Sequence, residues 1–259
     1  MTEPMVNWSV KIRRCVMDTA VGRFESATQA AEAVLEFGTE AGLGNDNLLY
    51  YYGHQWMLQY HRGELAKIKG VFRAAAEQQS RPVLRPALAA ICAEIGELDE
   101  CAAVLEDVDE STFALDDQDL LVAAAVTAIA ANAIGDEDRA KLAYDTLRPY
   151  ENQMIDNAST HFGSAQHYLG LAAAALTRPE EAIERLGTAS GIHQAGGLGP
   201  LASRSKVEAA RIQASQPGSA IEVEEALGSL ARLRNECDRR EFGGAAAAAN
   251  AALEAATRD

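Results

Sequence analysis

Apolar residues recur along this chain at the three- and four-residue spacing of amphipathic helices, and short turns interrupt the pattern. Ala102, Leu105 and Val108 follow this spacing in one stretch, and Ile183 and Leu186 follow it in another. The sustained alternation of apolar and polar residues that would predict strands is absent from the sequence. The pattern therefore predicts an all-α chain.

The turns between the predicted helices recur at intervals of 33 to 42 residues, which are typical of two-helix repeats. Glycine occupies four turns and threonine a fifth, and each is followed five positions later by a small or apolar residue. The turn residues are Gly22, Gly63, Gly96, Gly135 and Thr177, and the residues that follow are Ala27, Ile68, Cys101, Ala140 and Ala182. Glycine readily adopts the left-handed conformation that ends a helix, so each turn should end one helix and begin the next.

We expect a stack of antiparallel helix pairs from this repeat. The predicted pairs are 5–21 with 24–42, 46–62 with 64–79, 82–95 with 97–108, 118–134 with 136–150, 160–176 with 178–195, and 200–215 with 219–241, followed by a capping helix at 244–257. Such a stack forms a single right-handed α-solenoid domain over residues 1–259, with a concave groove lined by the first helices. The connections 109–117 and 151–159 are longer than tight turns, and they are either spacers or ligand-contacting loops.

The fifth unit resembles the tetratricopeptide repeat, because Leu169, Gly170, Ala182, Leu186 and Ala189 occupy the positions that this repeat gives to Leu-Gly, Ala, a large apolar residue and Ala. Between about residue 13 and residue 215, the order of segments resembles the C-terminal helical repeats of large bacterial signalling ATPases. These include multidomain adenylate/guanylate cyclases and LuxR-type regulators. The segments that carry this resemblance are 22–27, 61–65, 133–136, 147–150 and, most specifically, 163–175.

The chain departs from those signalling proteins in the parts that carry their chemistry. It has no GxxxxGK[ST] phosphate-binding loop, no cyclase domain and no C-terminal DNA-reading helix-turn-helix. The resemblance therefore implies neither catalysis nor DNA binding. It implies a module of a bacterial signalling or transcription-regulation system that binds a protein or a small-molecule inducer.

Residues 48–62 concentrate aromatic and histidine side chains on one predicted helix. Tyr52, Trp56 and Tyr60 share a face of this helix, and the pattern favours a core position for that face. Another set faces away from it or lies at its end, and it is either solvent-exposed or lines the concave groove. That set is Tyr51, His54, His61 and Arg62, and His167 on a later helix either packs or hydrogen-bonds at the groove as a further ligand-contacting residue. Aromatic rings beside a cationic group suit an aromatic or anionic ligand.

Charge narrows the choice of partners. The formal net charge is −15, so a nucleic-acid backbone would be repelled. Eleven acidic residues and no Lys, Arg or His lie between Glu94 and Asp119. This run is either a solvated face or a docking surface for a basic partner.

Metal and nucleophile chemistry find little support in the sequence. The cysteines Cys15, Cys92, Cys101 and Cys237 lack CxxC spacing, and neither His54 with His61 nor His161 with His167 has the spacing of a shared ligand face. We therefore expect no metal, cofactor or catalytic residue. No apolar run is long enough to span a membrane, and the composition predicts a cytoplasmic protein.

Three functions remain open at this point. The first is a non-enzymatic regulatory module that binds a protein partner through the groove. The second is a small-molecule sensor whose pocket is the 50–62 face, which an enclosed cavity would favour over an open groove. The third is an enzyme that uses His54, His61 or His167 as acid or base. The repeat pattern also predicts that Ala182→Trp destabilises the fold and that His54→Ala leaves it intact.

Overall fold

The computed structural model of this protein describes residues 3–78, 81–114, 119–157, 159–216 and 220–256. Within them the chain forms thirteen α-helices, three short 3-10 helices and one two-stranded hairpin. The helices of the first half are α1 (Glu3–Ala20), α2 (Phe24–Glu40), α3 (Gly44–Arg62), α4 (Lys69–Glu77), α5 (Leu84–Glu94), α6 (Leu98–Leu105) and α7 (Leu120–Ile134). Those of the second half are α8 (Glu137–Leu147), α9 (Ala165–Ala175), α10 (Pro179–Ala195), α11 (Gly199–Ala214), α12 (Ala220–Arg239) and α13 (Gly243–Ala256).

The predicted repeat turns are confirmed. All five turn residues have positive φ, from 56° at Thr177 to 88° at Gly22. The five residues that follow at the fifth position are all buried, with exposed fractions between 0% and 7%. Local sequence therefore set both the ends of the helices and the side chains that pack between them. The predicted boundaries at 79, 118, 219 and 257 lie outside the described residues, as does part of the 109–117 connection.

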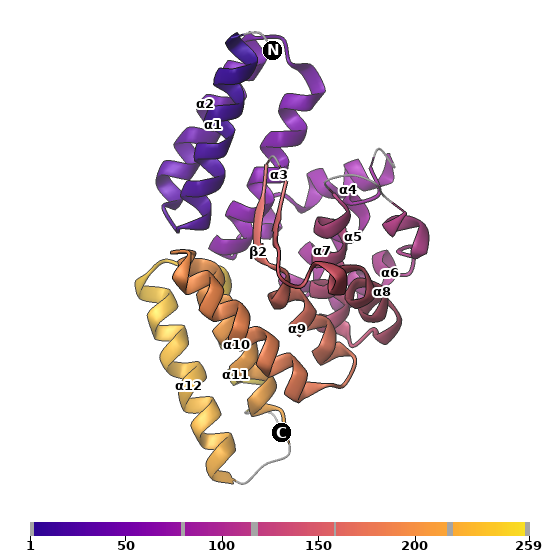
Figure 1. Ribbon diagram of the computed structural model, residues 1–259, viewed down its shortest axis with the longest axis vertical. Coiled ribbons are helices and arrows are strands. Elements are labelled where there is room, and N and C mark those ends of the chain that lie inside the picture. The colour runs from indigo at the N-terminus through magenta and orange to yellow at the C-terminus, as the bar shows by residue number, and fades with distance from the viewer. Residues whose placement is uncertain (1–2, 79–80, 115–118, 158, 217–219, 257–259) are drawn as a thin grey trace.

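Helices adjacent in sequence pack side by side, and alternate helices also pack on one another from α5 to α7 and from α7 to α9 (Figure 1). Helix α7 lies at the centre of this array, and residues 122–131 are buried on all sides of it. A helix that is apolar all round is buried on all sides, as its run of alanine, valine and isoleucine indicates. In the part of the chain that the structure describes, no helix combines the length and apolar character that crossing a membrane requires.

The two strands correct the prediction of a purely helical chain. Strand β1 (Met154–Asp156) pairs antiparallel with β2 (His161–Ser164), where the sequence predicted the start of a helix at residue 160. Asn157 shapes the turn, because its Oδ1 accepts hydrogen bonds from the backbone N–H of Ser159 at 3.0 Å and of Thr160 at 2.9 Å. Strands of three and four residues are too short to produce an alternating pattern.

The two ends of the helical array meet. Figure 1 shows α1 and α2 directly above α10 to α12, while α4 to α8 lie on the other side of the molecule. Helix α13 packs against α3, and α1 contacts α11. Glycines allow the closest approach, because a Cβ added to Gly244 would lie 2.0 Å from the carbonyl oxygen of Tyr60. The contact between α13 and α3 is not a neighbour-to-neighbour contact of a stack, so the helix pairs are confirmed and a simple solenoid is not.

Two substitutions test the side-chain packing of the pairs. Ala182 is 0% exposed, and Ala182→Trp should lower the free energy of unfolding by about 3 kcal/mol through overpacking. The prediction that His54→Ala leaves the fold intact assumed a side chain outside the core. The structure contradicts that assumption, because His54 is only 4% exposed. His54→Ala should therefore cost about 1–3 kcal/mol. Urea denaturation measures both against the exposed control Ala33→Trp, and equal effects in all three variants would contradict the packing.

Candidate functional site

A cavity of about 290 Å³ lies where the first helices of the pairs converge. Helices α3, α5, α7, α9, α11 and α13 all contribute to its wall. Its polar side is formed by Tyr60, Glu94, Asn132, Arg204, Glu208 and Arg211. Its apolar side includes Leu65, Ile95, Ile129, Leu171, Ala247, Ala248 and Ala251. The cavity occupies the position at which the sequence predicted a concave groove, but the packing of α13 against α3 helps to enclose it.

Arg204 organises the polar wall. Its guanidinium donates to both carboxylate oxygens of Glu94, with Nη2–Oε1 at 2.6 Å and Nη1–Oε2 at 2.9 Å. Its Nε donates to Glu208 Oε1 at 3.0 Å, and its Nη1 donates to the carbonyl oxygen of Gly244 at 3.3 Å. One side chain thus ties α11 to α5 and α13, across a sequence separation of 110 residues in the case of Glu94.

Arg211 continues the network toward solvent. Its Nε donates to Glu208 Oε2 at 2.9 Å, and its Nη2 donates to Asn132 Oδ1 at 3.3 Å. Arg204, Glu208 and Arg211 stand at spacings of four and three residues on α11, so they share one helix face. The Arg211 side chain is 34% exposed and its Nη1 makes no hydrogen bond to the described residues, so its outer edge is open to a ligand.

Opposing effects on pKa keep the network charged. Burial alone would raise the pKa of Glu208, but the guanidiniums of Arg211 and Arg204 lower it to about 2. Burial alone would lower the pKa of Arg204, but Glu94, Tyr60 and Glu208 raise it well above its ordinary value. The wall thus holds two guanidiniums and two carboxylates, whose formal charges cancel.

Tyr60 carries an unpartnered polar atom at this wall. Its hydroxyl is buried and has no hydrogen-bond partner. Its ring stacks on Trp56 at 5.2 Å, and the guanidinium of Arg204 lies 5.1 Å from the ring centre. Burial raises the pKa of Tyr60, so the group stays an O–H donor and acceptor. A buried polar group without a partner costs about 1–3 kcal/mol.

Small residues of α13 leave the cavity open on one side. Gly244, Ala247, Ala248 and Ala251 line it at helical spacing, and Ala247 and Ala251 are exposed. Larger side chains at these positions would occupy the space. The entrance to the cavity therefore lies along α13.

The site residues proposed from sequence lie near this cavity but not on its lining. Tyr51 and His54 pack toward the N-terminal helices, and His54 Nε2 lies 3.5 Å from Thr19 Oγ1. His61 is 3% exposed and stacks on Phe24 at 6.2 Å, and Arg62 lies 5.9 Å from the same ring. These four residues hold α3 against its neighbours, and a ligand-binding role for them stays a prediction.

His167, the fifth of those residues, belongs to a buried hydrogen-bond chain. Its Nδ1 lies 2.9 Å from Ser205 Oγ, which lies 3.3 Å from His193 Nδ1. The backbone N–H of Ser164 donates to His193 Nε2 at 2.8 Å, which places the proton of neutral His193 on Nδ1. This chain fixes β2, α9, α10 and α11 relative to one another behind the cavity.

The buried histidines predict acid sensitivity. Burial lowers the pKa of His54 and His193 to about 4, and that of His61 and His167 to about 3. Below the unfolded pKa of about 6.5, the unfolded chain binds protons that the folded chain does not, so stability falls as pH falls from 6.5 toward 4. Each histidine should contribute roughly 1 kcal/mol per pH unit. Urea denaturation at pH 7.5, 6.5 and 5.5 measures the slope, which His54→Gln should reduce by one histidine's share. A flat profile would contradict neutral burial.

A second cavity, of about 100 Å³, lies between α3, α5, α7 and the hairpin turn. The aromatic side chains at its wall are Tyr50, Tyr52, Trp56, Phe72 and Phe162. The ion pair of Arg81 with Asp119 also lines it, and Asn157 Nδ2 donates to Asp119 at 3.2 Å. The predicted core face of residues 52, 56 and 60 thus meets both cavities. The 151–159 connection contributes Asn157 and Ser159 to this smaller one.

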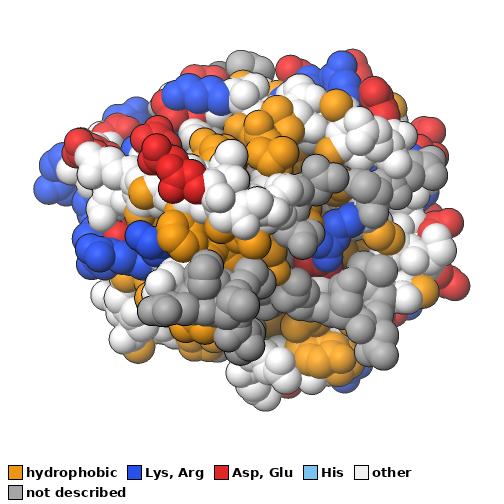
Figure 2. Space-filling view, turned by 90° about the horizontal axis from the view of Figure 1, so that it is seen from above, with side chains coloured by type: hydrophobic (Ala, Val, Ile, Leu, Met, Phe, Trp, Pro, Cys, Tyr) orange, Lys and Arg blue, Asp and Glu red, His pale blue; other side chains and the backbone are white. Residues whose placement is uncertain are grey.

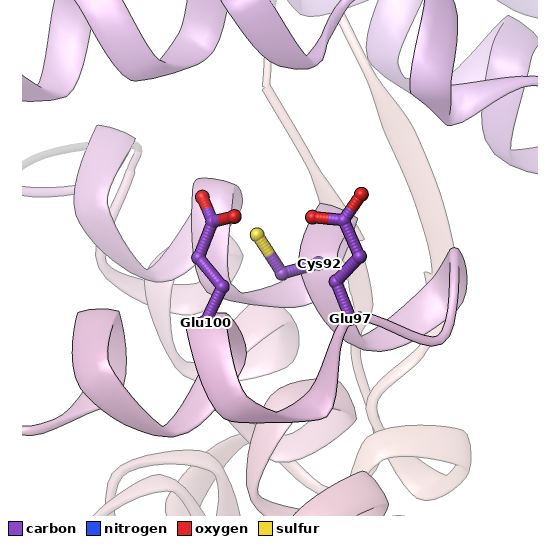
Figure 3. A group of neighbouring side chains, drawn as sticks. All are labelled: Cys92, Glu97 and Glu100. Atoms are coloured by element: carbon purple, nitrogen blue, oxygen red, sulfur yellow. The ribbon is translucent and has the colours of Figure 1, made fainter.

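Cys92, Glu97 and Glu100 form a group with the ligand types of a metal site, shown in Figure 3. Lys69 ion-pairs with Glu97 and, at 2.8 Å, with Glu100, and Arg73 also ion-pairs with Glu100. Burial raises the pKa of the Cys92 thiol to about 11, so the sulfur stays protonated. Because side-chain cations already contact both carboxylates, we interpret the group as an ion-pair cluster that joins α4 to α6.

The acidic run of residues 94–119 receives basic partners from other segments. Glu97, Glu100 and Asp107 pair with Lys69, Arg73 and Arg85, and Glu94 pairs with Arg204. The face in Figure 2 likewise shows acidic and basic side chains close together around a hydrophobic centre. With Asp119, which pairs with Arg81, five carboxylates of the run are thus engaged within the chain. A basic docking partner for the remainder stays a prediction.

Comparison with known protein families, curated proteins and solved structures finds no match to this chain. The resemblance to signalling ATPases therefore stays a prediction. Sequence reasoning missed Glu94, Asn132, Arg204, Glu208 and Arg211, because charged residues at helical spacing are typical of solvated helix faces. One feature of the sequence could have indicated them: small residues such as Ala202, Ser205 and Ala210 surround the charged residues of α11, and small residues are typical of close helix packing.

Proposed function

We propose that this chain is a non-enzymatic sensor module that binds a small polar molecule in the central cavity. The observation that carries the proposal is a cavity of about 290 Å³ whose wall holds two guanidiniums and two carboxylates, with Arg211 Nη1 free of hydrogen bonds to the described residues. A cavity with a few convergent polar groups on an otherwise apolar wall is the usual form of a ligand site.

Enclosure favours a small ligand over a protein partner at this site. The first helices face a cavity that α13 covers in part, where it packs across the array to α3, and that opens along α13. A catalytic reaction by a cysteine nucleophile finds no support. Burial raises the pKa of Cys15 and Cys92 to about 11 and of Cys101 to about 12, so these thiols stay protonated. His54, His61 and His167, the candidate acids or bases, do not line the cavity.

Binding in the cavity would couple distant parts of the chain. A ligand there contacts α3, α5 and α7 on one side and α11 and α13 on the other, so it favours the conformation in which the two ends of the curved array meet. A relay to a protein partner in a bacterial signalling or transcription-regulation system would follow from that bias. This partner is the part of the proposal that rests on the family resemblance alone.

A thermal-shift panel of amino acids, sugars, nucleotides and organic acids tests the proposal. At 100 times its dissociation constant, a ligand should stabilise the protein by about 2.7 kcal/mol. That corresponds to a rise in Tm of about 5–10 °C for a chain of this size. Ala247→Leu fills the entrance and should abolish the rise, whereas the control Ala255→Leu, on the exposed end of the same helix, should preserve it.

Two results would contradict the proposal. If no compound raises the Tm of the wild-type protein, or if Ala247→Leu responds as fully as Ala255→Leu, then the cavity does not bind a small molecule. The charged wall would then serve only to hold the helices together.

A further inference from the structure

We infer that the ligand of the central cavity is a small zwitterion with a carboxylate, an ammonium group and an apolar body, as in a free α-amino acid. This inference rests on the proposed function and specifies the chemistry of the same site. Three features of the wall carry it: its charge balance, the separation of its donors from its acceptors, and its apolar side.

Charge balance disfavours singly charged ligands. Arg204 and Arg211 compensate Glu94 and Glu208, so the wall has no spare charge of either sign. A monoanion or monocation would bring an uncompensated charge into a largely buried space, which is strongly unfavourable. A zwitterion adds no net charge and still uses the charged groups.

The donor side of the wall suits a carboxylate. Arg211 Nη1 is free of hydrogen bonds to the described residues, and Asn132 accepts through Oδ1 from Arg211 Nη2, leaving its Nδ2 without a partner in the same set. A guanidinium edge beside an amide N–H can donate to the two oxygens of one carboxylate. Both side chains line the cavity and lie at its more exposed end.

The acceptor side suits an ammonium group. Each Glu94 oxygen accepts one hydrogen bond from Arg204 and keeps capacity for another. An ammonium group has three N–H donors, so it can donate to Glu94 while Arg204 keeps its own hydrogen bonds to that carboxylate.

The apolar side accepts the body of the ligand. Ile129 and Leu171 face the cavity from α7 and α9, and the small residues of α13 complete this surface. A volume of about 290 Å³ is well above what a single water molecule needs, so the cavity has room for a small molecule such as an amino acid.

Calorimetric titration of the whole chain tests the inference with four zwitterions: L-alanine, L-valine, L-leucine and L-phenylalanine. Each is compared with its N-acetyl derivative, which is only an anion, and its amide, which is only a cation. At least one amino acid should bind with a Kd below about 1 mM, which is the weak end of specific affinity. Both of its derivatives should bind at least tenfold more weakly.

Variants assign the binding to this wall. Arg211→Gln removes the carboxylate partner and should weaken the amino acid at least tenfold, whereas Arg240→Gln, on an exposed side chain away from the cavity, should leave it unchanged. Ala247→Leu provides a second loss by filling the space, should Arg211→Gln fail to fold.

Each other outcome has a distinct meaning. Equal binding of an amino acid and its N-acetyl derivative, or full binding by both cavity variants, overturns the inference. So does the absence of binding by all four amino acids. If sugars or organic acids then bind in a manner that Ala247→Leu abolishes, the proposed function stands without the zwitterion. If nothing binds, both fail.

Discussion

Replacing Gly244 by alanine should lower the free energy of unfolding by about 3 kcal/mol, a large effect for the addition of one methyl group. The new Cβ would lie 2.0 Å from the carbonyl oxygen of Tyr60, and a backbone atom cannot move aside as a flexible side chain can. Helix α13 would have to move away from α3, which opens the central cavity. Urea denaturation measures the loss.

The matched control is Gly228→Ala in the middle of α12. A Cβ there would contact only Arg232 Nη1, at 3.5 Å. Alanine is a better helix former than glycine by up to about 1 kcal/mol, so this variant should be as stable as the wild-type protein or more stable. Equal stability of the Gly244 and Gly228 variants would show that α13 does not close against α3.

Arg204→Met should destabilise the protein by about 3–5 kcal/mol. The substitution leaves the carboxylates of Glu94 and Glu208 in a largely buried wall without their shared guanidinium, and an uncompensated buried charge is costly. Denaturation at pH 7 measures the loss. A lower pH should narrow the gap to the wild-type protein, because protonation removes the unpaired charges.

The control for this effect is an exposed ion pair. Arg13 donates to Asp156 at 2.8 Å, but the two side chains are 55% and 30% exposed. Arg13→Met should therefore cost no more than about 1 kcal/mol. If Arg204→Met cost as little, the network would not be the buried clamp between α5 and α11 described above.

The helix pairs could be predicted from sequence because their signals are local. A glycine at a turn and a small residue five positions later act within one hairpin of helices, and Gly22, Gly63, Gly96 and Gly135 all adopt the left-handed conformation expected of them. The closure of the array could not be predicted in this way. It depends on contacts such as Arg204 with Glu94, 110 residues apart, and no repeat pattern reports them.

The aromatic stretch of α3 shows why the site was only half predicted. Trp56 and Tyr60 are core residues, as the helical spacing indicated. The set that includes His54 and His61 was expected to be exposed or to line a groove, yet both side chains are buried as well. Helix α3 is covered on that side by the N-terminal helices, while α13 packs against its end. A single sequence does not reveal how many sides of a helix are covered.

The strands and the charged wall were missed for different reasons. The hairpin depends on one side chain, Asn157, and on strands shorter than any periodic signal. The charges of α11 have the spacing of a solvated face, and only their small neighbours distinguish them. A charged residue can be assigned to a buried ion pair only when the neighbouring helix is known, because the oppositely charged partner lies on that helix.

Native mass spectrometry of the protein captured from the lysate of its own host tests the central claim most directly. The account predicts a one-to-one complex with a small molecule in the wild-type chain and in Ala255→Leu, and its loss in Ala247→Leu. A stoichiometric protein partner, with no small molecule and no difference between the two alanine variants, would contradict a ligand-binding cavity and favour a docking module.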